Sequence, residues 1–182
     1  MKRHVKPGPE IDELRRYVLL VFTRAYATAS METGEHRYAH AAIPLLHERI
    51  ALHVKYQRFE EQVESTSTLG RMLAQTLGDI TDEQVISCFQ RAHDIGTTHE
   101  ITGAAYITNK DLGHLRQAQG RYADAINLFL TAIAALQRGH GTKSFAQVAS
   151  RELESSTAPF DCLLLTDAYD EAEALALRYP SV

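Results

Sequence analysis

The chain has 182 residues, of which 45% are apolar and 23% charged, and its formal net charge is −4. This composition excludes an intrinsically disordered chain, and two cysteines are too few for a disulfide framework. The slight negative charge gives no overall positive field, so we expect no nucleic-acid partner. The most apolar early stretch, residues 17–22, is far shorter than the roughly 20 residues that cross a membrane. We therefore expect no membrane partner and a cytoplasmic location.

The periodicity of the apolar residues predicts helices along the whole chain. Apolar side chains recur at intervals of three and four, and no stretch alternates as a strand would. The fold class is therefore all-α. Pro44 in the second segment predicts a kink in that helix, or a later start. In chain order the expected helices cover residues 10–31, 37–55, 58–77, about 82–94 (with Thr81 or Asp82 as N-cap), 100–119, 122–138, 144–154, and from 162 or 166 to 178.

An internal repeat groups these helices into pairs. Residues 37–52 are identical to residues 121–136 at seven of sixteen positions, with an offset of 84 residues, or twice 42. Residues 68–75 also resemble residues 111–118. A period of this length is typical of stacked helical hairpins. We expect one repeat domain over residues 10–182 after a flexible segment of residues 1–9, with four antiparallel hairpins at about 10–55, 56–96, 98–139 and 143–180.

The clearest copy of the unit lies at residues 109–132, where small and large residues stand at fixed intervals. These residues are Leu112, Gly113, Gly120, Tyr122, Ala125, Phe129 and Ala132. The segment resembles a tetratricopeptide repeat, and units of about 42 residues resemble the longer repeats of kinesin light chains and of bacterial peptide-sensing regulators. The resemblance implies a right-handed α-solenoid in which Gly113 and Ala125 allow close helix approach and Gly120 forms a turn.

In tetratricopeptide proteins the first helix of each hairpin lines a concave groove that binds peptides, and the resemblance implies the same groove here. Asp111 stands where the chaperone-binding members have an asparagine of their clamp for a peptide's terminal carboxylate, which argues against such a clamp. The mixed charges suit an extended or helical peptide. The candidate groove residues are Arg24, Glu64, Thr68, Arg71, Lys110, Asp111, His114 and Gln117.

These features predict a non-catalytic adaptor or scaffold that binds a protein or peptide and needs no cofactor. The sequence has no P-loop, Gly-x-Gly-x-x-Gly or Ser/His/Asp signature. One alternative is a sensory module that forms a homodimer through the apolar residues 17–22 or 163–165. Another is a helical-bundle metal protein or enzyme built on His36, His40 and His47. The chain lacks the two Glu-x-x-His pairs of di-metal bundles, so we predict no metal site.

Overall fold

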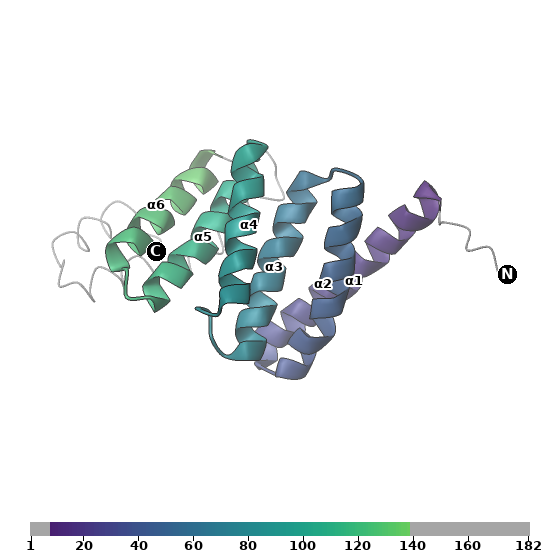
Figure 1. The fold of residues 1–182 in the computed structure, drawn as a ribbon, viewed down its shortest axis with the longest axis horizontal. Coiled ribbons are helices and arrows are strands. Elements are labelled where there is room, and N and C mark those ends of the chain that lie inside the picture. The colour runs from purple at the N-terminus through teal and green to yellow at the C-terminus, as the bar shows by residue number, and fades with distance from the viewer. Residues whose placement is uncertain (1–7, 139–182) are drawn as a thin grey trace.

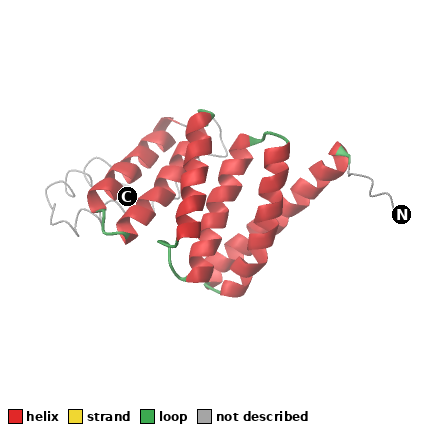
Figure 2. Ribbon diagram, viewed as in Figure 1, coloured by secondary structure: helices red, strands yellow, loops and turns green. Residues whose placement is uncertain are grey.

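The computed structural model describes residues 8–138, and every regular element in this part is an α-helix (Figure 1, Figure 2). The expected all-α class is confirmed for these residues. The fourth expected hairpin and most of the N-terminal segment lie outside the described residues. In chain order the helices are α1 (Pro9–Thr33), α2 (His36–Lys55), α3 (Phe59–Leu77), α4 (Glu83–Thr98), α5 (Thr102–Ala118) and α6 (Tyr122–Arg138).

Local sequence signals set several of the helix ends. Pro9 opens α1, where its missing N–H removes no hydrogen bond. Asp82 caps α4, because its side chain accepts a hydrogen bond of 2.8 Å from the backbone N–H of Gln84. Pro44 lies inside α2, which already begins at His36. The expectation that this proline delays the start of the helix is therefore wrong.

Two kinds of turn alternate along the chain. Within each helix pair the turn holds a glycine with positive φ, namely Gly34 (69°), Gly78 (69°) or Gly120 (71°). Glycine adopts this left-handed region without the steric cost that other residues have, which explains its presence at these sites. The expected turn at Gly120 is confirmed. Between pairs the positive φ falls on Gln57 (54°) and Glu100 (51°), which are 43 residues apart. The turns thus repeat with nearly the period of the sequence.

A small residue faces a large one inside the second and third helix pairs. A Cβ atom on Gly113 of α5 would lie 2.5 Å from Cε1 of Phe129 on α6. A Cβ atom on Gly70 of α3 would lie 2.6 Å from Cε1 of Phe89 on α4. Both phenylalanine rings are buried. Because no side chain fits at either glycine without moving the ring, these contacts set how closely the paired helices approach.

The first helix pair has the same arrangement with different residues. Ala27 of α1 and Leu46 of α2 each lie 43 residues before Gly70 and Phe89, and both belong to one buried cluster. Alanine adds a methyl group to one helix, and leucine is shorter than phenylalanine on the other. The pair therefore has a small residue and a larger one at the positions equivalent to the glycine and the phenylalanine. This equivalence extends the repeat to a hairpin whose sequence shows it weakly.

The remaining residues of the predicted repeat pattern lie in or beside the core. Leu112 is buried in a cluster with Val85 and Phe89 of α4, so it packs between neighbouring pairs. Ala125 and Ala132 on α6 are also buried. Tyr122 is half-buried and packs against the Ala125 and Phe129 cluster.

Neighbouring pairs stack mainly where the second helix of one pair packs on the first helix of the next, α2 on α3 and α4 on α5. Each helix packs against the next one along the chain, and α1 also contacts α3, as α3 contacts α5. Within residues 8–138, α2, α4 and α6 touch one another at most marginally. The first helices therefore lie closer together than the second helices. Figure 1 shows the pairs in chain order, from α1 in purple at one end to α6 in green at the other.

We expect Gly113→Ala to destabilise the protein and Phe129→Leu to rescue it in part. The new methyl group would collide with the ring of Phe129, and overpacking of this kind costs about 1–3 kcal/mol, more than the roughly 1 kcal/mol that alanine gains as a helix former. The shorter leucine makes room, and the first pair has leucine and alanine, Leu46 and Ala27, at the equivalent positions. Chemical denaturation of both single variants and the double variant measures this coupling.

The double variant should lose less stability than the two single variants together, since the residues touch. Ser87→Ala, at an exposed site on α4, is the control and should change the free energy of unfolding little. Strictly additive losses would contradict the close contact between Gly113 and Phe129.

Candidate functional site

Polar side chains connect the first helices of neighbouring pairs. Between α1 and α3, Nη2 of Arg24 lies 3.1 Å from Oε1 of Glu64. Between α3 and α5, Nη1 of Arg71 lies 3.5 Å from Oδ1 of Asp111, to which Ser67 also donates a hydrogen bond. Four of the residues predicted from the sequence thus meet in two contacts. We call the surface that α1, α3 and α5 form together the α1–α3–α5 face.

A pocket of about 140 Å³ lies between α1 and α3 on this face. Three arginines and one carboxylate line it, so the charge of its lining is positive. Alanine and methionine side chains supply an apolar part. We call it the arginine pocket, and its lining consists of Thr23, Arg24, Ala27, Thr28 and Met31 from α1, Arg49 from α2, and Glu64, Thr68, Arg71 and Met72 from α3.

Arg49 reaches this pocket from α2 and is only 3% exposed. Its Nη2 atom lies 3.5 Å from Oε2 of Glu64, and its Nε atom is buried without a hydrogen-bond partner. Burial lowers the pKa of the Arg49 guanidinium, and the charge of Glu64 opposes that shift. A guanidinium nevertheless stays protonated in proteins. The pocket therefore holds a buried positive charge with one long ion pair.

His53 lies one helical turn after Arg49 and is fully buried. Neither of its ring nitrogens has a hydrogen-bond partner. Burial, together with the positive charge of Arg49, lowers the pKa of His53 to about 4, and Arg16 of α1 adds to this shift. Glu61 and Glu64 of α3 act in the opposite direction. The imidazole is therefore neutral near pH 7 and lies next to the buried arginine.

Three of the predicted groove residues on α5 contact their own pair and do not line the arginine pocket. The ammonium of Lys110 lies 5.2 Å from the ring centre of Tyr106. The ring of His114 meets Phe129 of α6 edge-on, with ring centres 5.0 Å apart, and burial lowers the pKa of this imidazole. Gln117 hydrogen-bonds to His114. The predicted groove residues therefore divide between the arginine pocket and the hairpin of α5 and α6. Contact of these α5 residues with a peptide stays a prediction.

Sequence reasoning missed Arg49, because it placed only first helices on the groove. A signal was nevertheless present. Arg49 and His53 follow the buried Leu46 at intervals of three and four residues, which puts two ionisable side chains on the core side of α2. Arginine is almost never fully buried unless it is paired. Such residues at core positions point to a buried polar site.

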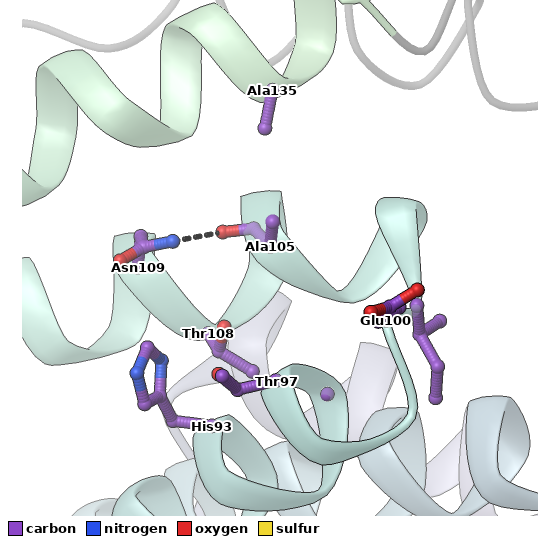
Figure 3. A pocket seen from close by; sticks show the side chains of 9 residues that line it. His93, Thr97, Glu100, Ala105, Thr108, Asn109 and Ala135 are labelled. Carbon is purple, nitrogen blue, oxygen red and sulfur yellow. Dashed lines mark hydrogen bonds between the residues drawn. The ribbon is translucent and has the colours of Figure 1, made fainter.

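A second pocket, of about 300 Å³, lies among α4, α5 and α6 (Figure 3). The hydroxyl of Thr108 and the amide of Asn109 donate to the carbonyls of Ala104 and Ala105 in their own helix, at 3.0 and 2.6 Å. The Thr108 hydroxyl and one N–H of the Asn109 amide are therefore used within α5. No sequence pattern indicated this pocket. Its lining consists of His93, Gly96, Thr97, Glu100, Ile101, Ala105, Thr108, Asn109 and Ala135.

The histidines that raised a metal-site alternative lie exposed along α2. These are His36, His40 and His47. Among the described residues, no group of three or more His, Cys, Asp or Glu side chains is placed to hold a metal ion. Cys88 is half-buried, and burial raises the pKa of its thiol, which keeps it protonated near pH 7.

Comparison with protein-family models, curated proteins and solved structures finds no match for this chain. Among residues 8–138, no helix has the length and apolar character needed to span a membrane.

We expect the buried His53 to make stability fall as the pH is lowered from about 6.5 to about 4. In this range the unfolded chain binds a proton that the folded chain excludes, since the pKa of His53 is near 6.5 when unfolded and about 4 when folded. The loss amounts to about 3 kcal/mol at most. Urea denaturation at several pH values, for the natural chain and for His53→Leu, measures it.

The difference in stability between the two proteins should change across this range and stay constant above pH 7. His47→Leu, at an exposed site on the same helix, serves as the control and should follow the natural chain. Parallel profiles for the natural chain and His53→Leu would show that His53 titrates normally.

Proposed function

We propose that the chain is a non-catalytic module of the cytoplasm that binds a peptide or protein segment on its α1–α3–α5 face. In this proposal the helix pairs belong to a tetratricopeptide-like, right-handed solenoid of about four hairpins. The repeated turns, the glycine–phenylalanine contacts and the closer spacing of the first helices support it. First helices that lie closer together than second helices favour a curved array with α1, α3 and α5 on the inner side.

The arginine pocket is the observation that carries this proposal. Arg24, Glu64, Thr68 and Arg71 were chosen from sequence positions alone, and all four line one cavity between two hairpins. Their side chains come from different first helices, as expected for a groove that runs across an array. A concave site with a few convergent polar groups is the usual form of a binding site.

Selection from a library of random displayed peptides tests this function. Peptides that bind the natural chain should bind Arg71→Ala at least about tenfold more weakly, since truncation of an arginine at a binding hot spot commonly costs more than 1.4 kcal/mol. Fluorescence anisotropy with labelled peptides measures the dissociation constants. Far-UV circular dichroism shows whether the variant stays folded.

Arg121→Ala is the matched control, because Arg121 pairs with Asp124 at the start of α6 and does not line the pocket. It should leave the affinity unchanged. Failure to select any peptide, or equal effects of Arg71→Ala and Arg121→Ala, would reject the α1–α3–α5 face as the binding site.

The outer side of α1 favours a second candidate function, the formation of a homodimer. Its apolar side chains are 42–64% exposed, and Ile11, Leu14, Val18 and Val21 follow the alternating spacing of three and four that is typical of a helix–helix seam. A second copy presents the same seam and can form a two-fold symmetric contact. The exposed apolar residues of α1 are Ile11, Leu14, Tyr17, Val18, Val21, Phe22 and Met31.

Six of these side chains are concentrated in one part of α1, between Ile11 and Phe22, whereas Met31 lines the arginine pocket. Exposed apolar side chains gathered in this way are typical of a surface that packs against a partner. We therefore expect a dimer in which the two α1 helices pack against each other.

Val18→Glu should convert that dimer to a monomer, because it would place a charge in the centre of the buried seam. Light scattering after size exclusion, at protein concentrations from about 1 to 100 μM, measures the mass. Val54→Glu, at an exposed apolar site on α2, is the control and should remain dimeric. A natural chain that is monomeric throughout this range would reject the dimer.

A further inference from the structure

The arginine pocket contains more positive charge than the chain neutralises there. Arg24 and Arg49 share one carboxylate, Glu64, at 3.1 and 3.5 Å. Arg71 turns one Nη atom to the hydroxyl of Thr68 at 3.2 Å and the other to Asp111, which lies outside the pocket lining. Three guanidinium groups therefore surround a cavity whose lining holds one negative charge.

The hydrogen-bonding capacity of Arg49 is also incompletely used. Buried guanidinium donors are normally all paired, because an unpaired buried donor loses its hydration without compensation. The Nε atom of Arg49 has no hydrogen-bond partner, and the hydrogen bond from its Nη2 atom to Glu64 is long. An anion in the cavity would supply acceptors to a side chain that is already fixed in place by burial.

The dimensions and the apolar part of the pocket indicate what carries this anion. A volume of about 140 Å³ is well below the roughly 300–1,000 Å³ of sites for whole drug-sized ligands. Ala27, Met31 and Met72 form an apolar wall beside the charged groups. A short aliphatic stem that ends in a carboxylate matches both features, and arginine binds carboxylates with two parallel hydrogen bonds.

We propose that the arginine pocket binds the side-chain carboxylate of a glutamate in the peptide partner, with Arg49 and Arg24 as the direct contacts. The inference rests on the proposed function, whose ligand class it narrows to acidic peptides. Arg49 lines the pocket and has a buried Nε–H without a partner, and Arg24, whose side chain is 65% exposed, contacts the ligand from the solvent side. The stem of the glutamate packs against the methionines.

Glu64 acts as an internal competitor in this arrangement. It forms ion pairs with both Arg24 and Arg49. An incoming carboxylate must take over part of these contacts beside a like charge, which weakens its binding. Glu64→Gln should therefore strengthen the binding of the ligand, whereas a residue that only holds the structure together would not have this effect.

Two isomeric probes of equal charge test the source of the carboxylate. N-acetyl-glutamate α-amide carries its charge on the side chain, and N-acetyl-glutamine carries it at the chain end. Each is titrated into the full chain at constant ionic strength, with inorganic phosphate and potassium chloride as further arms. The readout is the NMR cross-peak of the Arg49 Nε–H, which is assigned by its loss in Arg49→Lys.

The proposal expects a saturable shift with the glutamate amide, and an affinity about fivefold or more above that for N-acetyl-glutamine. Glu64→Gln should raise this affinity, and Arg24→Met should lower it. Arg24 is largely exposed, so its variant folds even if changes at Arg49 do not. Arg121→Met, far along the chain at an exposed ion pair of α6, should leave the affinity unchanged.

Other outcomes would overturn the proposal in distinct ways. Tighter binding of phosphate, or of N-acetyl-glutamine, would reject the glutamate side chain as the ligand. A shift that chloride reproduces at equal ionic strength would show screening alone, and no shift would show that Arg49 is not a contact. If library peptides bind but contain no required acidic residue, the peptide-binding function stands and this inference fails. If the amide binds and no peptide is selected, the pocket is a carboxylate site, but the peptide-binding function and the peptide as the source of the carboxylate are both rejected.

Discussion

The distance between paired helices is the constraint on which the rest of this structure depends. In two pairs a phenylalanine ring occupies the space that a glycine leaves open, and in the first pair a leucine lies in the same cluster as an alanine. Dense packing of this kind has little tolerance, since the neighbour of either glycine would have to move to admit one methyl group. Each pair is thus a unit of fixed width, and the array follows from stacking these units.

Stacking brings side chains from different units together on the α1–α3–α5 face. The contacts between units there are polar, as in the pairs of Arg24 with Glu64 and of Arg71 with Asp111. The interiors of the second and third units are instead apolar around Phe89 and Phe129. This separation lets the packing hold the fold while the face between first helices carries the charges that a ligand can use.

The sequence predicts the features that depend on near neighbours. The sequence offers Thr81 or Asp82 as the cap and Gly120 as a turn from local backbone chemistry, and the structure has the cap at Asp82 and the turn at Gly120. The spacing of the repeat also identifies the buried side of α6, including Phe129. These predictions succeed because a helix or a turn is set by residues within a few positions of one another.

Contacts across the array are harder to read from the sequence. Arg49 enters the pocket from a second helix, where the repeat pattern offers no reason to look for a ligand contact. His114 stands 43 residues after Arg71, yet its ring packs on Phe129 whereas Arg71 lines the pocket. Equivalent positions in a repeat point their Cα–Cβ bonds in the same direction. The neighbouring side chains then decide where the end of each side chain lies.

The walls of the arginine pocket belong to different helix pairs, and this has a mechanical consequence. The two walls are joined by the hydrogen bonds between Ser30 and Gln75 at 2.7 and 2.8 Å. Ala27 of α1, Leu46 of α2 and Met72 of α3 also belong to one buried apolar cluster that spans both units. A close-packed core of this kind has little room for alternative arrangements. The core that joins the two units therefore also fixes the spacing of the walls, so the pocket is preformed before a ligand enters.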